Sequence, residues 1–354
     1  MGRCSSVDKL KVGVIGATGL VGQKFAQLLS DHPFMEVASV YASDRSSGRS
    51  YSDFLSFDED LAQRYEGLIV KESNPDTVLG DRNDIIFSAV SDANAGKIEK
   101  HLARKGSTIL TNASANRLEN DVPLVIPEVN PHHLESLNSS HGMIVANGNC
   151  STIGMVLGLA PIADMGLEEV YVTTMQAVSG AGYPGVPSID MLSNIIPFIK
   201  SEEEKMVNET RKIFGNFTSS DRTGSKMKIH PTCIRVPVRE GHLESITAVL
   251  SEDPDINMLR ERFRNFGNGN LKARLPTLPE KSVILMNGED RPQPLLDVMA
   301  GSPERARGMA VTVGRLRVSG SRVSFVALVN NLIRGAAGSA VLNAEVLHES
   351  GLVT

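Results

Sequence analysis

A glycine-rich turn near the start of the chain constrains its fold more than any other segment. The β-branched run at residues 10–15 predicts a strand, and Gly16, Gly19 and Gly22 follow it directly. Apolar residues at helical spacing come next and predict a helix. A strand, a glycine turn and a helix in this order point backbone N–H groups at a pyrophosphate. The spacing G-x-x-G-x-x-G departs from the commoner G-x-G-x-x-G, so a tight turn without a ligand remains the alternative.

Strands and helices alternate as far as about residue 148, which predicts a doubly wound parallel (Rossmann) sheet. We expect its further strands at residues 35–41, 67–70, 83–90, 107–112, 122–126 and 143–146. Beyond residue 150 the β-type runs follow one another with few helices, which favours an α+β domain with an antiparallel-type sheet. These runs are 170–178, 228–230, 233–238, 244–250, 310–316 and 324–329. We expect one domain at 8–149, onto which an amphipathic C-terminal helix within 335–354 packs back, and a second at 150–334.

Cys150 is the strongest candidate for a chemical role. It lies between a short β-prone run at 143–146 and an apolar run of helical spacing at 153–160. Unpaired N–H groups and the helix dipole at a helix N-terminus favour a thiolate, so we expect a lowered pKa and a nucleophile. A small buried cysteine in a tight turn is the alternative.

The segment after the second predicted strand bears on the cofactor. In a dinucleotide fold this position meets the adenosine ribose, where an acidic residue selects the 2′-hydroxyl and an arginine accommodates a 2′-phosphate. Arg45 and Arg49 stand here in a serine-rich loop and favour NADP over NAD, whereas Asp44 favours NAD.

Composition excludes several classes of protein. A formal net charge of −5, without basic runs, argues against nucleic-acid binding. Three cysteines are too few for a disulfide framework or a metal cluster, which fits a reducing compartment. No apolar run reaches the roughly 18 residues of a membrane span. Gly2 matches a loose myristoylation pattern, for which a chance match is the alternative. We expect a cytoplasmic protein that binds neither metal, membrane nor nucleic acid.

Taken together, the motifs resemble those of aspartate-semialdehyde dehydrogenases of the archaeal and fungal branch, over essentially the full length. The resemblance is carried by Gly-Ala-Thr-Gly-x-x-Gly at 16–22, Ser-x-Arg-Ser-x-Gly at 43–48, Gly-Asn-Cys-Ser-Thr at 148–152, the segment 176–188 and Glu-Glu-Glu-Lys-Met at 202–206.

The resemblance implies an enzyme that reduces L-aspartyl 4-phosphate with NADPH to L-aspartate 4-semialdehyde and phosphate. The reaction would pass through a cysteine thioester and serve lysine, threonine and methionine biosynthesis. Residues 150–334 would be the catalytic and dimerisation domain of a homo-oligomer, a dimer or tetramer. A reductase of an acyl thioester such as malonyl-CoA is the alternative within the same chemistry. A non-catalytic dinucleotide-binding protein is the alternative from another class.

The resemblance also implies roles for single residues. Cys150 would be the nucleophile, His242 the general acid/base, and Gln176 the residue that holds the reacting group. The substrate-binding residues would be Arg235 for the carboxylate, Glu209 for the ammonium, and Lys212, Arg117 and Asn149 for phosphate. The implied cofactor-binding residues are Gly16, Thr18, Gly19, Leu20, Val21, Gly22, Ser43, Arg45, Ser46, Ser91, Ser179, Gly180 and Asn331.

Each of the less specific residues has a plainer interpretation. Glu209 and Lys212, three apart, also fit a surface ion pair on a helix. A single histidine such as His242 is commonly solvated or already hydrogen-bonded. Arg235 alternates with Ile234 and Val236 and also fits a solvent-facing position.

Overall fold

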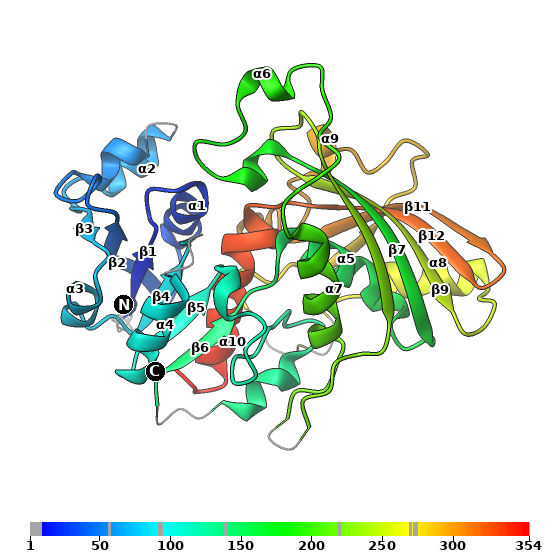
Figure 1. Cartoon of the computed structure of the whole chain (residues 1–354), viewed down its shortest axis with the longest axis horizontal. Helices are drawn as coiled ribbons and strands as arrows, with labels where there is room; N and C mark the ends of the chain where they lie inside the picture. The colour runs from blue at the N-terminus through cyan, green and yellow to red at the C-terminus, as the bar shows by residue number, and fades with distance from the viewer. Residues whose placement is uncertain are drawn as a thin grey trace, which may run out of the picture.

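The computed structural model describes residues 9–55, 58–90, 95–137, 141–218, 221–268, 271 and 275–353. Two six-stranded sheets lie side by side, one built by the N-terminal part of the chain and one by the later part (Figure 1). Gly2, Cys4 and Ser91 fall outside the described residues.

The first sheet is parallel throughout, as the alternation of strands and helices predicts. Its order is β3-β2-β1-β4-β5-β6, so the chain starts in the centre and winds outward in both directions. Its strands are β1 (Leu10–Ile15), β2 (Met35–Ala42), β3 (Lys71–Glu72), β4 (Ile85–Ser88), β5 (Thr108–Thr111) and β6 (Met143–Ala146). Its helices are α1 (Leu20–Leu29), α2 (Glu59–Arg64), α3 (Pro75–Gly80) and α4 (Ala95–Arg104).

Two strands predicted for this sheet are not strands in the structure. The run 122–126 forms only one isolated bridge, from Leu124 to Ala146. The Asn130 side chain accepts a hydrogen bond from the Ile126 N–H and donates one to the Leu124 carbonyl. These backbone groups are then no longer available for hydrogen bonds to a neighbouring strand. At 67–70 only Ile69 forms a bridge, to Ser50, and the strand itself is the later, shorter β3.

The second sheet is mixed, with the order β10-β11-β12-β9-β7-β8. Its centre is antiparallel, but the outer pairs β10·β11 and β7·β8 are parallel. The strands are β7 (Leu167–Gln176), β8 (Lys228–Arg235), β9 (His242–Leu250), β10 (Val283–Leu285), β11 (Val311–Ser319) and β12 (Arg322–Val329). The two runs predicted at 228–230 and 233–238 therefore belong mainly to one strand. Helices of this part are α6 (Ser188–Met191), α7 (Glu202–Ile213), α8 (Ile256–Asn265) and α9 (Pro294–Asp297).

Two apolar helices lie in the middle of the molecule (Figure 1). Helix α5 (Cys150–Leu159) packs on β9 and β12 and shares the larger hydrophobic core with the second sheet. A π-helical turn, Ile333–Ala337, leads into α10 (Gly338–Glu349), which packs on α1 and β5. The C-terminal helix is buried nearly all round instead of amphipathic, because it sits in the core of the first sheet. Every helix within the described residues is too short or too polar to cross a bilayer.

Candidate active site

A cavity of about 530 Å³ opens between the glycine turn and the start of α5. One wall comes from the turn that follows β1, and the opposite wall comes from α5, α7 and the ends of β7 and β8. The structure thereby brings together residues that are far apart in the sequence. The sequence-predicted residues that line the cavity are Gly19, Leu20, Val21, Arg117, Asn149, Cys150, Gln176, Ser179, Gly180, Arg235 and Asn331.

Cys150 is the first residue of α5 and is partly open to the cavity. Asn149 caps the helix, since its side-chain oxygen accepts hydrogen bonds from the N–H groups of Ser151 at 3.0 Å and Thr152 at 3.2 Å. The sequence predicts a lowered thiol pKa here, and the structure gives the opposite. Burial, and next the negative charge of Glu202, raise the pKa of Cys150 to about 12 and outweigh the helix N-terminus and nearby arginines.

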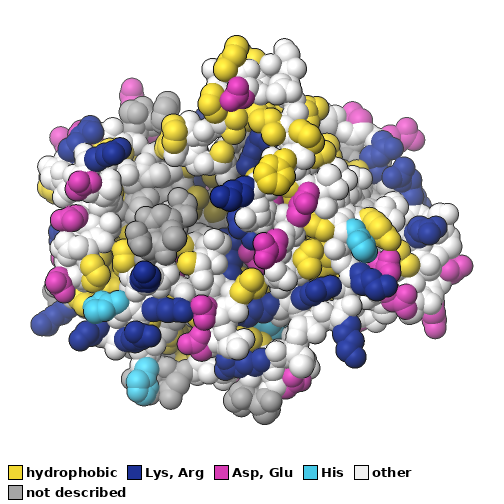
Figure 2. Space-filling view, in the orientation of Figure 1, with side chains coloured by type: hydrophobic (Ala, Val, Ile, Leu, Met, Phe, Trp, Pro, Cys, Tyr) yellow, Lys and Arg dark blue, Asp and Glu magenta, His cyan; other side chains and the backbone are white. Residues whose placement is uncertain are grey.

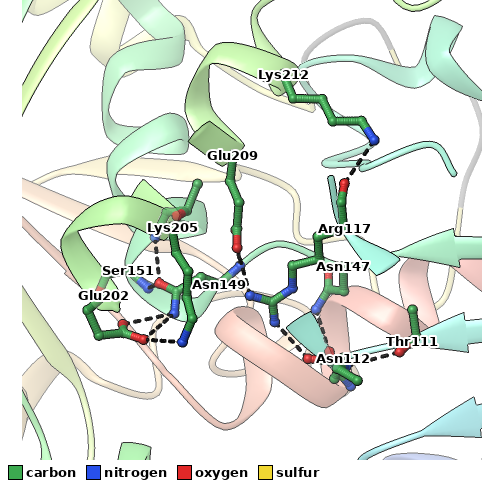
Figure 3. A network of polar contacts seen from close by, with 12 residues as sticks. Thr111, Asn112, Arg117, Asn147, Asn149, Ser151, Glu202, Lys205, Glu209 and Lys212 are labelled. Carbon is green, nitrogen blue, oxygen red and sulfur yellow. Dashed lines mark hydrogen bonds and ion pairs between the residues drawn. The ribbon is translucent and has the colours of Figure 1, made fainter. Parts of the chain in front are cut away.

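Glu202 and Lys205 line the same cavity as Cys150, and Figure 3 shows both side chains beside Asn149. They belong to the motif at 202–206, for which the sequence predicts no individual role. The Glu202 carboxylate accepts hydrogen bonds from Asn149 Nδ2 at 2.9 Å and Gln176 Nε2 at 3.3 Å, and pairs with Lys205 Nζ at 2.9 Å. Burial acts to raise the pKa of Glu202, but Lys205 and these donors lower it overall, so the group is a carboxylate. Glu202 and Lys205 are three residues apart within Glu-Glu-Glu-Lys, and this spacing was the sequence signal for a pair of opposite charges on one helix face.

Glu209 and Lys212 lie on the same helix but do not line the cavity. Glu209 pairs with Arg117 Nη1 at 2.8 Å and accepts the Asn149 N–H at 2.6 Å (Figure 3). Lys212 Nζ donates to the carbonyl oxygens of residues 117, 119 and 122 at 2.6–2.8 Å. Both side chains thus hold the segments that carry Arg117 and Asn149, and neither is the surface ion pair of the alternative interpretation.

Arg235 and Gln176 end two neighbouring parallel strands, β8 and β7. Arg235 is buried rather than solvent-facing, and its Nη1 donates to the Ala177 carbonyl at 2.7 Å. Gln176 Nε2 also donates to Thr174 Oγ1 at 3.2 Å. The two side chains therefore have fixed positions in the wall of the cavity that Cys150 also lines.

His242 opens β9 and is fully buried. Its Nδ1 accepts the Ala177 N–H at 3.1 Å, whereas its Nε2 has no hydrogen-bond partner among the described residues. Gly180 lines the cavity whereas His242 does not, and a Cβ at residue 180 would be 3.1 Å from Nε2. Burial, and next the charge of Arg235, lower the pKa of His242 to about 3, so the imidazole is neutral.

The turn after β1 fits a dinucleotide pyrophosphate. Gly16 has a φ of +79°, which favours glycine, and a Cβ at Gly22 would lie 2.3 Å from the Gly16 carbonyl oxygen. Within the turn, the Thr18 carbonyl accepts a hydrogen bond from the Gln23 side chain. Elsewhere in the cavity wall, Asn331 Nδ2 donates to Ser179 Oγ at 2.9 Å. The backbone at Gly16 and at Gly22 is therefore packed too closely for side chains, so backbone groups of the turn would contact the pyrophosphate.

The loop after β2 holds the residues predicted for the ribose. Ser43 and Ser46 belong to a turn in which the Ser46 N–H donates to the Ser43 carbonyl. Asp44 accepts the Arg45 N–H with its carboxylate, and Arg49 is tied to Asp53 at 3.3 Å. The Arg45 side chain is exposed, whereas that of Arg49 is held by Asp53.

The residues that the structure describes contain no group of three or more His, Cys, Asp or Glu side chains that could hold a metal ion. His133, adjacent to His132, is buried, and its Nδ1 lies 3.0 Å from Asn130 Nδ2.

The fold and a cysteine that faces a dinucleotide-type turn define the semialdehyde dehydrogenase class. Residues 11–137 match the family model "Semialdehyde dehydrogenase, NAD binding domain", and residues 159–334 match "Semialdehyde dehydrogenase, dimerisation domain". The chain is 40% identical to the aspartate-semialdehyde dehydrogenase of Archaeoglobus fulgidus, with 98% of this chain and 100% of that protein covered. The chain belongs to the aspartate-semialdehyde dehydrogenase family.

Two further similarities bear on cofactor and substrate. The crystal structure of aspartate semialdehyde dehydrogenase with NADP from Candida albicans superposes with a TM-score of 0.86 at 34% identity, covering 98% of this chain and 100% of that one. The malonyl CoA reductase (NADP) of Metallosphaera sedula is 34% identical, with 97% of this chain and 98% of that protein covered.

Proposed function

We propose that the protein reduces L-aspartyl 4-phosphate with NADPH to L-aspartate 4-semialdehyde and phosphate, reversibly, in lysine, threonine and methionine biosynthesis. The observation that carries the proposal is the position of Cys150, which opens into a cavity with the glycine turn on one wall and Arg235 and Glu202 on the other. Membership of the aspartate-semialdehyde dehydrogenase family supports this choice of substrate.

The chemistry proceeds through a thioester on Cys150. Sulfur attacks the acyl carbonyl and phosphate departs, which leaves an acyl group that accepts hydride. Gln176 holds the reacting group, and its hydrogen bonds to Thr174 and Glu202 fix the amide. His242 acts as the general acid/base, which provides a proton for the carbonyl oxygen as that oxygen gains negative charge.

Charged side chains around the cavity match the other ends of the substrate. Arg235 suits the α-carboxylate because its planar guanidinium makes paired hydrogen bonds to a carboxylate. Glu202 takes the role that the sequence suggested for Glu209, the pairing with the substrate ammonium. Lys205 and Arg117 provide positive charge for the phosphate, and the Asn149 side-chain amide lines the same cavity. Lys212 does not line the cavity, but it holds the Arg117 backbone through a hydrogen bond to its carbonyl oxygen.

NADP(H) supplies the hydride when it is bound. The residues that would hold its pyrophosphate are Gly16, Thr18, Gly19, Leu20, Val21 and Gly22, and those that would hold the 2′-phosphate are Ser43, Arg45 and Ser46. Ser179, Gly180, Asn331 and Ser91 complete the proposed cofactor site. The NADP-bound Candida albicans enzyme supports this choice of cofactor.

Assembly and organisation complete the proposal. We divide the chain into a cofactor domain of 8–149 with 335–354, and a catalytic and dimerisation domain of 150–334. Hydrophobic side chains gather on the surface over α6 (Figure 2), among them Ile189, Leu192, Ile195 and Phe198. Apolar patches of this kind are covered in assemblies, which supports a homo-oligomer, either a dimer or a tetramer. A working thiol also favours the reducing cytoplasm.

Substitution of the nucleophile tests the mechanism. Cys150→Ala should abolish turnover but leave NADP(H) binding unchanged, and the wild-type enzyme mixed with acyl phosphate alone should gain the acyl mass on Cys150. Cys233→Ala is the matched control, because Cys233 is a buried thiol away from the cavity wall. Turnover by the Cys150 variant would exclude covalent catalysis.

A further inference from the structure

A further buried carboxyl group lies against the helix that carries Cys150, and the proposed reaction does not use it. Glu244 is the third residue of β9, one of the strands on which α5 packs, and its side chain is 0% exposed. Neither of its carboxyl oxygens has a hydrogen-bond partner among the described residues. Buried polar groups are nearly always hydrogen-bonded in folded proteins, so an exception of this kind needs a physical explanation.

Two residues of α5 lie close to this carboxyl group. A Cβ at Gly154 would be 3.0 Å from Glu244 Oε1 and 2.7 Å from Val329 Cγ1, so the helix backbone packs directly on β9 and β12 here. Ser151, one turn earlier in the helix, is near enough to Glu244 to act on its pKa, and the Ser151 hydroxyl also lacks a partner among the described residues. Glu244 therefore lies beside the helical turn that begins with Cys150.

A carboxylate is disfavoured at this position. A buried negative charge requires a basic partner or several hydrogen-bond donors, and Glu244 has neither among the described residues. Burial raises the pKa of Glu244 well above its usual range, although the Ser151 hydroxyl acts in the other direction. Glu202, in contrast, is paired with Lys205 and accepts hydrogen bonds from Asn149, which keep it ionised. The two carboxyl groups that border the start of α5 therefore differ in charge.

We propose that Glu244 is an uncharged carboxylic acid that positions the first turn of α5 through Ser151. The inference rests on the proposed function, in which Cys150 is the nucleophile. An uncharged acid has one O–H donor and a free acceptor, and a serine hydroxyl both donates and accepts, so the two side chains can satisfy each other. An apolar residue could not hold the serine, and a carboxylate would oppose the thiolate that attacks the substrate. A neutral acid holds the helix without opposing the thiolate.

Alkylation of Cys150 in the full-length protein tests the charge of Glu244. Glu244→Gln replaces an uncharged acid with an uncharged amide of the same shape, so the rate of iodoacetamide labelling should stay within about twofold of wild type at each pH. Glu202→Gln removes a real negative charge, so it is the matched comparison and should label faster. Labelling of Glu244→Gln as fast as that of Glu202→Gln would show a carboxylate at residue 244 and overturn the inference. This readout needs no turnover, so it separates the inference from a failure of the proposed function.

Steady-state kinetics test the positioning role. Glutamine keeps a donor and an acceptor for Ser151, whereas methionine has a similar length and no N–H or O–H group. Glu244→Met should lower kcat about tenfold or more, the worth of roughly one hydrogen bond, with little change in KM, and Glu244→Gln should keep a kcat close to that of wild type. Equal kcat in the two variants, with NADP(H) binding intact in both, would show that the role is wrong.

Ser151→Ala provides a second test that does not require Glu244→Met to fold. Alanine removes the hydroxyl and leaves the carboxyl of Glu244 in place, so kcat should fall by a factor similar to that of Glu244→Met, again with little change in KM. An unchanged kcat in Ser151→Ala would overturn the inference.

Discussion

Asn149 donates from its side-chain amide to both carboxylate oxygens of Glu202, at 3.1 and 2.9 Å. The same amide group caps α5 through its oxygen, so the residue that fixes the nucleophilic helix also fixes the buried carboxylate. Asn149 therefore fixes the position of the Glu202 carboxylate relative to the start of α5, where Cys150 lies.

This relationship predicts that Glu202 and Glu209 behave differently. Glu202→Gln keeps the shape but removes the charge that would pair with the substrate ammonium, so KM for L-aspartate 4-semialdehyde should rise about tenfold or more. Glu209→Gln is the matched control on the same helix and should act instead on the Arg117 position, and thus on phosphate dependence. Steady-state kinetics with each substrate varied in turn will distinguish them. A larger effect of Glu209→Gln on the aldehyde KM would return the ammonium site to Glu209.

The raised pKa of Cys150 predicts a pH dependence of alkylation. With a pKa of about 12 the thiol is protonated at neutral pH, and the reactive thiolate grows tenfold with each pH unit. The rate of iodoacetamide labelling in the ligand-free protein should therefore rise steadily between about pH 7 and 9, followed by mass spectrometry of the Cys150 peptide. Glu202→Gln should label faster at every pH, because Glu202 contributes to the raised pKa. A plateau below about pH 8 would show a low-pKa thiolate.

Arg45 should control the choice between the two nicotinamide cofactors. Arg45→Ala removes the exposed guanidinium at the end of β2, so KM for NADPH should rise about tenfold or more while activity with NADH changes little. Arg49→Ala is the control, since Arg49 is already paired with Asp53 and stacked on Phe54. Equal effects of Arg45→Ala on both cofactors would place the 2′-phosphate elsewhere.

The buried pair of Glu128 and Arg334 should matter for stability more than for catalysis. Both side chains are 0% exposed, and the guanidinium makes two hydrogen bonds to the carboxylate at 2.8 and 2.7 Å. Glu128→Ala leaves a buried charge unpaired and should lower the free energy of unfolding by about 3–5 kcal/mol. Arg64→Ala, which breaks an exposed pair with Asp31, should cost less than about 1 kcal/mol. Denaturant unfolding of both variants checks this, and similar losses would contradict it.

Much of the fold follows from local patterns that tertiary contacts do not override. The strands β1, β2 and β6 and the start of α5 lie where β-branched runs and glycines predict them. The strand expected at 122–126 is absent because one side chain, Asn130, satisfies its backbone, which periodicity cannot reveal. The parallel pairing of β7 and β8 follows from the helical crossover between them, which carries α6 and α7.

The candidate site was predictable in its residue types but not in every position. Glu202 and Lys205 have the same spacing as Glu209 and Lys212, and seven residues, about two turns, separate the pairs. Both pairs therefore face the same side of α7, about 10 Å apart along its axis, and spacing alone cannot decide which reaches the cavity. The raised pKa of Cys150 depends equally on tertiary placement, since Glu202 approaches the thiol only in the folded chain.

The most direct test of the central claim is NADP reduction by the purified protein with L-aspartate 4-semialdehyde, measured with phosphate, with coenzyme A in its place, and with neither. The proposed function predicts NADPH formation that depends on phosphate and is lost in Cys150→Ala. Reduction that requires coenzyme A would contradict it and favour a thioester substrate, as in the malonyl CoA reductase relative. No reduction under any of the three conditions, by protein that still binds NADP(H), would contradict the assignment of this aldehyde as substrate.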